Sequence, residues 1–246
     1  MTYPEPTLPV AVREVPHWRV VFRPGHYNAE SIPTLGDCRR IIERTHVSLR
    51  GWDYPQLSPD PSESGSGENW IASWSAFMGH LEYWRFYQSG QFVHLFSVRE
   101  STEKKWREKL RADAASHLAP KSGLDWGSVP GFISITNTIY CLTEIFEFAT
   151  RLCEAGVYRG TTSITIELHG ISGFVLSADW NRGWHQHCAA SMDVLSHTWP
   201  ASSDTLIRGR DLTIEAAIWF FERFEWHNPS PKVIEKDVQD LLESKL

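Results

Sequence analysis

The alternation of hydrophobic and polar positions predicts several β-strands. The clearest alternation covers residues 163–169, where Ile164, Ile166 and Leu168 fall on one face. Residues 17–23 are also rich in strand-forming side chains and stop at Pro24-Gly25. Because successive side chains of a strand point to opposite faces, this pattern predicts a sheet with one face turned toward a core.

An aromatic segment in the middle of the chain predicts an antiparallel meander. The predicted strands cover residues 70–77, 81–87 and 92–96. Ser89-Gly90 separates the last two, and a two-residue loop with glycine favours a tight hairpin. Residues 163–169 and 174–176, joined by a glycine turn, predict a second hairpin. The β-branched density of residues 132–142 favours a further strand.

Apolar stripes at helical spacing predict the helices. They cover residues 34–43, 102–117, 144–154, 212–226 and 232–246. Thr143 is a candidate cap for the third of these. Three prolines within residues 1–9 predict an extended arm, and residues 58–67 and 184–199 are expected to be irregular.

The order of these elements indicates the fold class. Strands and helices do not alternate as βαβ units require, so we expect an α+β fold with a predominantly antiparallel sheet. The sheet would hold about eight strands in hairpins, with helices on one face and a C-terminal helix pair. We expect one domain over residues 1–246, with a division into two lobes near residues 120–130 as the alternative.

Composition and charge narrow the class of protein. The 246 residues carry 24 Lys and Arg against 30 Asp and Glu, a formal charge of −6, which disfavours nucleic acid as a direct partner. There is no signal-peptide pattern and no run of 18 apolar residues, so we expect no membrane contact. The four cysteines lie far apart without a CxxC pair, which is typical of reduced thiols and a cytoplasmic location.

Sequence motifs for several kinds of chemistry are absent. The chain contains no P-loop, dinucleotide fingerprint, HExxH, EF-hand or G-x-S-x-G pattern, so we expect no cofactor. His185 and His187 would share one face of a strand, next to Cys188. A structural zinc site needs four ligands and a catalytic one usually three, so we predict a histidine-rich polar loop here and no metal site.

Tryptophan is abundant, with 12 of the 246 residues, and it gathers with charged side chains along residues 50–94. Tyr83, Arg85 and Tyr87 share one face of a predicted strand. Rings and a guanidinium together are typical of a binding surface, in which the rings stack and the arginine takes an anion. The alternative is a core lined with tryptophan and tyrosine beside a cross-strand aromatic ladder.

Two segments of this region carry a family resemblance. Residues 49–55 (LRGWDYP) and 82–92 (EYWRFYQSGQF) resemble stretches of bacterial proteins that are associated with Schlafen-type (AlbA_2) nucleic-acid-binding domains, and residues 143–148 (TEIFEF) give a weaker echo. The Schlafen-type core motif itself is absent, so its activity is not carried over. The resemblance implies an accessory or sensing module in a bacterial system.

These observations favour a non-catalytic recognition module in a bacterial regulatory or defence system, binding a protein partner or small ligand. The candidate binding residues are Trp52, Asp53, Tyr83, Arg85, Tyr87 and His94. The apolar face of the C-terminal helix, with Val238, Leu241 and Leu242, is a candidate dimer or partner contact.

The alternative function is a hydrolase or nuclease that uses carboxylates and histidine. It would place its cleft near Glu82, His94 and His185. Acid–base pairing of Glu144 with Glu147, or of Glu82 with Glu167, is the form that this chemistry would take.

Overall fold

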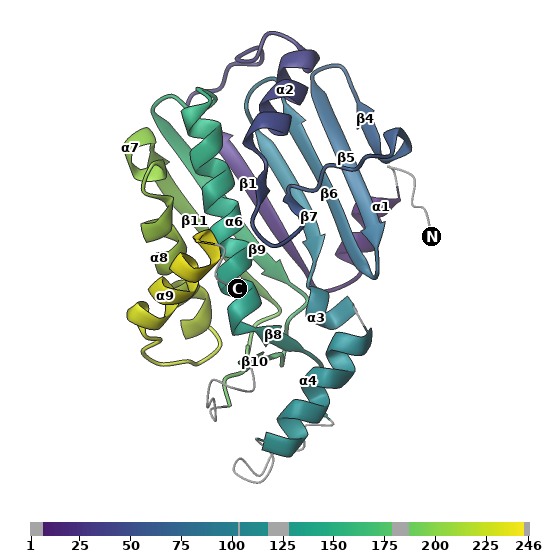
Figure 1. The fold of residues 1–246 in the computed structure, drawn as a ribbon, viewed down its shortest axis with the longest axis vertical. Coiled ribbons are helices and arrows are strands. Elements are labelled where there is room, and N and C mark those ends of the chain that lie inside the picture. The colour runs from purple at the N-terminus through teal and green to yellow at the C-terminus, as the bar shows by residue number, and fades with distance from the viewer. Residues whose placement is uncertain (1–6, 103, 118–127, 179–186, 244–246) are drawn as a thin grey trace.

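The computed structural model describes residues 7–102, 104–117, 128–178 and 187–243. At its centre is a seven-stranded antiparallel sheet in the order β11-β9-β1-β7-β6-β5-β4 (Figure 1). Its strands are β1 (His17–Pro24), β4 (Ser64–Ser66), β5 (Trp70–Phe77), β6 (His80–Tyr87), β7 (Phe92–Ser97), β9 (Thr161–His169) and β11 (Val194–Ser202). The predicted α+β class and antiparallel sheet are confirmed.

Two short strand pairs lie outside the main sheet. The hairpin of β2 (Val47–Ser48) and β3 (Asp53–Tyr54) packs over the face of the sheet that carries α6, and β8 (Phe132–Ser134) pairs in parallel with β10 (Val175–Ser177). A 3₁₀ turn, η1 (Pro61–Glu63), precedes β4.

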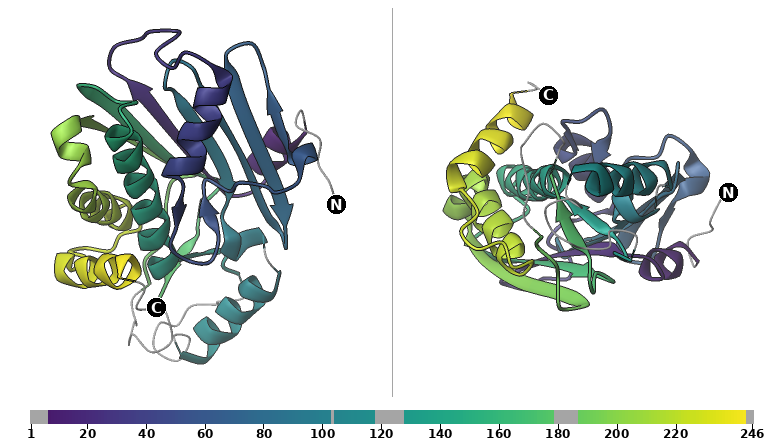
Figure 2. Two further views of the ribbon diagram at one scale, coloured as in Figure 1. Left: turned by 45° about the horizontal axis from the view of Figure 1, so that its top comes forward. Right: turned by 90° about the horizontal axis from the view of Figure 1, so that it is seen from below.

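One long helix dominates the layer that covers the sheet. Thirteen of the 20 residues of α6 (Ile135–Glu154) are buried. Figure 2 shows α6, α8 (Gly209–Glu222) and α9 (Pro231–Leu242) on the same side of the sheet, so the predicted C-terminal helix pair is present. The other described helices are α1 (Leu8–Arg13), α2 (Leu35–Thr45), α3 (Arg99–Thr102), α4 (Lys104–His117) and α7 (Ser203–Leu206).

The main core lies between the sheet and α6. Phe148 of α6 packs against Phe22 and Phe92, with ring centroids 6.0 and 5.0 Å apart. Phe146 meets Trp199 of β11 edge to face. Burying such a ring stabilises the fold by about 1.5–3 kcal/mol, so these contacts fix α6 across the middle of the sheet.

The opposite face of the sheet is partly covered by α1. Leu8 and Val12 pack on Trp74, Tyr83 and Leu95 in a separate apolar cluster. The extended arm predicted for residues 1–9 is therefore wrong from Leu8 onward. The physical reason is that Pro9 stands in the first turn of the helix, where its missing N–H has no bonding partner to lose.

The strand predicted for residues 132–142 is mostly wrong. Only β8 is extended, and α6 begins at Ile135 with the Ser134 hydroxyl accepting a hydrogen bond from the Asn137 backbone N–H at 3.1 Å. Thr143 lies inside the helix rather than at its cap, and its hydroxyl donates to the Ile139 carbonyl. A helix that is buried on most sides has apolar residues all round, so its sequence does not show the alternation of apolar and polar residues with a period of 3.6.

Two strand pairings also differ from the prediction. The strand β9 pairs with β1 and β11 rather than with β10, so the second hairpin was wrong. Part of the segment predicted to be irregular at residues 184–199 belongs to β11, and part of the loop at 58–67 forms the edge strand β4. Both misplaced strands lie at the two edges of the sheet, where short or proline-containing strands are tolerated.

Candidate functional site

A cluster of buried charged residues lies between α6, the β2–β3 hairpin and strands β6 and β7. Three of its carboxylates, on Glu82, Glu100 and Glu144, are buried, and so is the imidazole of His94. A buried charge destabilises a fold by several kcal/mol unless it is paired and hydrogen-bonded. We therefore expect these buried groups to be paired with one another or with nearby polar groups.

Glu82 is the centre of the first half of the cluster. Alternation along β6 places it on the α6 side of the sheet, and its carboxylate accepts three hydrogen bonds, from the backbone N–H of Gln56 (2.8 Å), His94 Nε2 (2.8 Å) and His80 Nε2 (3.2 Å). Burial opposes the negative charge, but His94 and His80 outweigh it and hold the pKa of Glu82 well below its usual range. Glu82 is thus an ionised carboxylate that is buried from bulk solvent.

His94 is oriented by this carboxylate. Its Nε2–H donates to Glu82, and its ring packs against Tyr54 and Phe96 with centroids 4.9 and 4.8 Å away. Its other ring nitrogen, Nδ1, is buried and has no hydrogen-bond partner within the described part of the chain. An imidazole held through one nitrogen presents the second as a proton acceptor.

Arg50 and Glu144 form the second half of the cluster. The guanidinium of Arg50 binds both carboxylate oxygens of Glu144, at 2.9 Å through Nε and 2.5 Å through Nη2. Its Nη1 donates to Asn137 Oδ1, and the Asn137 amide donates in turn to Glu100 at 3.0 Å. Burial raises the pKa of Glu144 and of Glu100, although Arg50 acts in the opposite direction on both.

Tyr54 stands between the two halves. Its ring packs against Phe148 and Phe96, while its hydroxyl is buried without a hydrogen-bond partner among the described residues. Burial, together with the negative charges of Glu82 and Glu144, raises the pKa of Tyr54 well above its usual value. The hydroxyl therefore keeps its proton and is available as a donor.

The two halves enclose a small inner cavity of about 40 Å³. Tyr54, His94, Glu82, Arg50 and Glu144 all line it. A volume of roughly 10–15 Å³ on this scale holds one water molecule, so the cavity has room for a water or for the polar end of a larger molecule.

An outer groove of about 500 Å³ adjoins this cavity and shares Trp52, His80, Glu82 and Arg99 with it. Trp52 stands at the junction, stacked on His80 with the ring planes 5° apart and with the Arg99 guanidinium 4.7 Å from its ring centre.

The walls of the groove are partly apolar. Phe77 and Met78, at the β5–β6 turn, are 67% and 70% exposed, and the loop before β4 forms the other side. An apolar groove that leads to a few convergent polar groups is the usual form of a small-molecule site.

The structure divides the sequence-predicted binding residues into two groups. Trp52, Asp53 and His94 line the inner cavity. The side chains of Tyr83, Arg85 and Tyr87 lie on the opposite face of the sheet. These are the chain positions that alternate with Glu82 and Trp84 along β6. They therefore do not join the first group.

The second group is itself mostly covered. Tyr83 is buried beneath α1, and Arg85 stacks on Trp70 with its guanidinium 3.9 Å from the ring centre. On this side of the sheet, the packing is that of a cross-strand aromatic ladder, which was the alternative to a binding surface in the sequence analysis.

The suggested acid–base pairs are not formed. Glu144 binds Arg50, whereas Glu147 pairs with Arg151 one turn further along α6. Glu167 lies on the other face of the sheet from Glu82, bound to Arg19 and His169. The sequence correctly singled out Glu82 and His94 as neighbours in a cleft, but His185 lies outside the described residues.

Three residues of the cluster, His80, Glu100 and Asn137, were missed as site residues, and Glu144 was considered only as an acid–base partner of Glu147. A charge one turn before Phe148, inside the apolar stripe of a helix, is the signal that could have placed Glu144 in the core. No group of three or more His, Cys, Asp or Glu side chains in the described ranges could hold a metal ion. Within the same ranges, no helix is long and apolar enough to cross a bilayer.

Comparison of the chain with protein-family models, curated proteins and solved structures found no match. The resemblance to Schlafen-type domains stays a prediction, and the geometry of the site carries the argument for function.

Proposed function

We propose that this protein recognises a small molecule, whose polar end enters the inner cavity and whose apolar body lies in the outer groove. The single observation behind this proposal is that two buried polar atoms, Tyr54 Oη and His94 Nδ1, lack partners among the described residues and belong to residues lining one cavity. Each unmade hydrogen bond destabilises the fold by about 1–3 kcal/mol. A ligand that satisfies both atoms would recover that free energy on binding.

The cavity also indicates the chemistry of the polar end. Tyr54 offers a donor and His94 an acceptor, so the ligand needs an acceptor and a donor close together, as in a hydroxyl or a carboxamide. The carboxylates of Glu82 and Glu144 already have hydrogen-bond partners, because Glu82 accepts from two histidines and Glu144 binds Arg50. An uncharged head group therefore enters with the smallest electrostatic penalty.

The test uses four probes with the same ring: benzamide, benzyl alcohol, benzoate and benzylamine. Binding to the whole protein is measured by ligand-observed NMR titration. We expect the two neutral probes to bind and Tyr54→Phe to weaken them about fivefold, the value of one neutral hydrogen bond. Trp52→Ala, which opens the junction, should weaken them further.

The matched controls come from the other face of the sheet. Tyr87→Phe and Trp70→Ala make the same chemical changes at half-buried positions away from the groove, and should leave probe binding unchanged. Equal binding by wild type and Tyr54→Phe, or no binding by any probe, would contradict the proposal.

A second candidate function, acid–base catalysis on the bound molecule, is favoured by one specific observation. A carboxylate that holds a histidine through Nε2 while Nδ1 faces no partner is the arrangement of a general base with its orienting group. In this function His94 would accept a proton from a water or hydroxyl held at Tyr54. Turnover of benzamide or of phenyl acetate that disappears in His94→Asn and persists in Tyr87→Phe would support it, whereas binding of these probes without turnover would count against it.

A further inference from the structure

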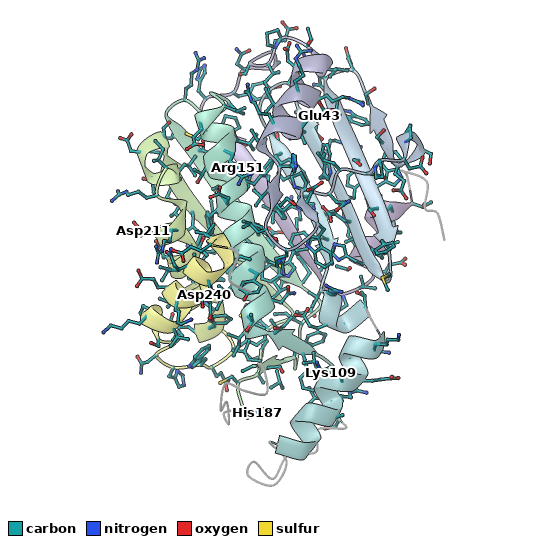
Figure 3. All side chains as sticks on the ribbon, in the orientation of Figure 1. Glu43, Lys109, Arg151, His187, Asp211 and Asp240 are labelled. Carbon is teal, nitrogen blue, oxygen red and sulfur yellow. The ribbon has the colours of Figure 1, made fainter. Side chains whose placement is uncertain are left out.

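A second groove, of about 600 Å³, lies at a different place from the site described above. It is lined by the loop that follows β1, by one side of α2 and by residues 155–159 after α6. Figure 1 shows α2 beside the C-terminal end of α6, and Figure 3 labels Glu43 on α2 and Arg151 on α6 at this end of the molecule. None of its lining residues belongs to the cavity or groove beside Trp52.

The second groove is positively charged in a chain whose net charge is −6. Three arginines line it, Arg40, Arg44 and Arg159, against one carboxylate, Asp37. Asp37 is already occupied, because it accepts a hydrogen bond from the Thr34 hydroxyl and is paired with Arg40. These two bonds hold the pKa of Asp37 below its usual value. The negative charge of Asp37 is therefore already paired with Arg40, on the same helix.

Two guanidinium groups are left without a counter-charge. Neither Arg44 nor Arg159 has an ion pair or a side-chain hydrogen bond to any described residue. The two residues come from elements more than 100 positions apart in sequence, yet both line the same groove. The Arg159 guanidinium lies beside Gly156, where a Cβ would be 3.9 Å from its Nη2 atom.

We propose that this second groove binds a small phosphate-bearing molecule, with the phosphate between Arg44 and Arg159. Guanidinium groups bind phosphate through paired N–H donors, and a phosphate monoester carries close to two negative charges at neutral pH, which matches two arginines. The groove is larger than a phosphate ion and falls in the range of volumes that hold a whole metabolite. His26, Asn28 and Ser31 supply polar contacts for the rest of the molecule.

Inorganic pyrophosphate is the probe, and isothermal titration calorimetry on the full chain is the measurement. We expect saturable binding to the wild type and at least tenfold weaker binding to the double variant Arg44→Gln/Arg159→Gln, because each arginine supplies a charge-assisted bond. Both positions are exposed and have no side-chain partner in the described part of the chain, so the variant should fold as the wild type does. Circular dichroism checks this.

Two controls separate a site from general attraction of anions. The variant Arg107→Gln/Arg208→Gln removes the same charge from exposed positions outside the second groove and should bind pyrophosphate like the wild type. Succinate, at the same ionic strength, carries two charges without phosphate geometry and should bind more weakly. Equal pyrophosphate binding by the wild type and the groove variant, an equal loss in the control variant, or succinate binding as tight as that of pyrophosphate would each overturn the proposal.

Discussion

Replacing Glu82 by glutamine removes the charge at the centre of the buried cluster while keeping the size of the side chain. The carboxylate of Glu82 accepts three hydrogen bonds, two of them from histidines. A glutamine has one accepting oxygen, so its NH₂ group would face another donor. A hydrogen bond to a charged group is worth about 1.5–3 kcal/mol, and we expect Glu82→Gln to lower the free energy of unfolding by about 3 kcal/mol at pH 7.

The pH dependence of this difference follows from the direction of the pKa shift. Because the pKa of Glu82 in the folded protein lies below its ordinary value of 4.5, the stabilisation is complete above pH 4.5. It is lost progressively as the pH falls from there toward the folded pKa. The difference in free energy of unfolding between wild type and Glu82→Gln should therefore become smaller by about 1 kcal/mol between pH 7 and pH 4.

Urea denaturation followed by circular dichroism measures both quantities. Glu167→Gln is the matched control, because Glu167 also binds an arginine and a histidine but its side chain is 18% exposed on the other face. An ion pair of that kind is worth at most about 1 kcal/mol. Equal losses for Glu82→Gln and Glu167→Gln at pH 7, or a gap that does not change down to pH 4, would refute the reasoning.

Three further predictions concern stability at pH 7, each measured by the same urea denaturation. Tyr54→Phe should leave the free energy of unfolding unchanged or raise it by up to about 1 kcal/mol, since its hydroxyl has no partner to lose; a clear loss would place that hydroxyl in a bonded network. Arg50→Met should lower the free energy of unfolding by about 3 kcal/mol, because it leaves the Glu144 carboxylate unpaired in the interior. The control Arg151→Met removes a partly exposed ion pair and should lower it by less than about 1 kcal/mol, so similar values for the two variants would argue against the buried cluster. Gly209→Ala should destabilise by about 1–3 kcal/mol because its Cβ would lie 2.6 Å from Thr150 Oγ1 where α8 meets α6, and a neutral result would contradict this close approach.

The sequence predicted the sheet well where one face of a strand is buried and the other is not. Residues 163–169 alternate because β9 has the core on one side only. The meander, which forms β5, β6 and β7, was predicted from its strand-forming aromatic residues and the Ser89-Gly90 turn, since α1 covers part of its second face. Prediction failed for α6, whose burial on most sides removes the contrast between faces. It failed again for β11, where His197 and Pro200 interrupt an otherwise regular edge strand.

The candidate site was predictable only in part. Glu82 and His94 are brought together by the pairing of two adjacent strands, so a hairpin prediction already places them near each other. Arg50 and Glu144 are 94 residues apart, and no local pattern links them. The sequence does not show that α1 folds back over the face of β6 that carries Tyr83, so the burial of this residue could not be predicted.

The most direct test of the central claim is a crystal structure of the protein soaked with benzamide. We predict electron density for the carboxamide in the inner cavity, within hydrogen-bond distance of Tyr54 Oη and His94 Nδ1, with the ring in the outer groove beside Trp52. An inner cavity that holds only water bonded to both atoms, with benzamide elsewhere or absent, would contradict the account.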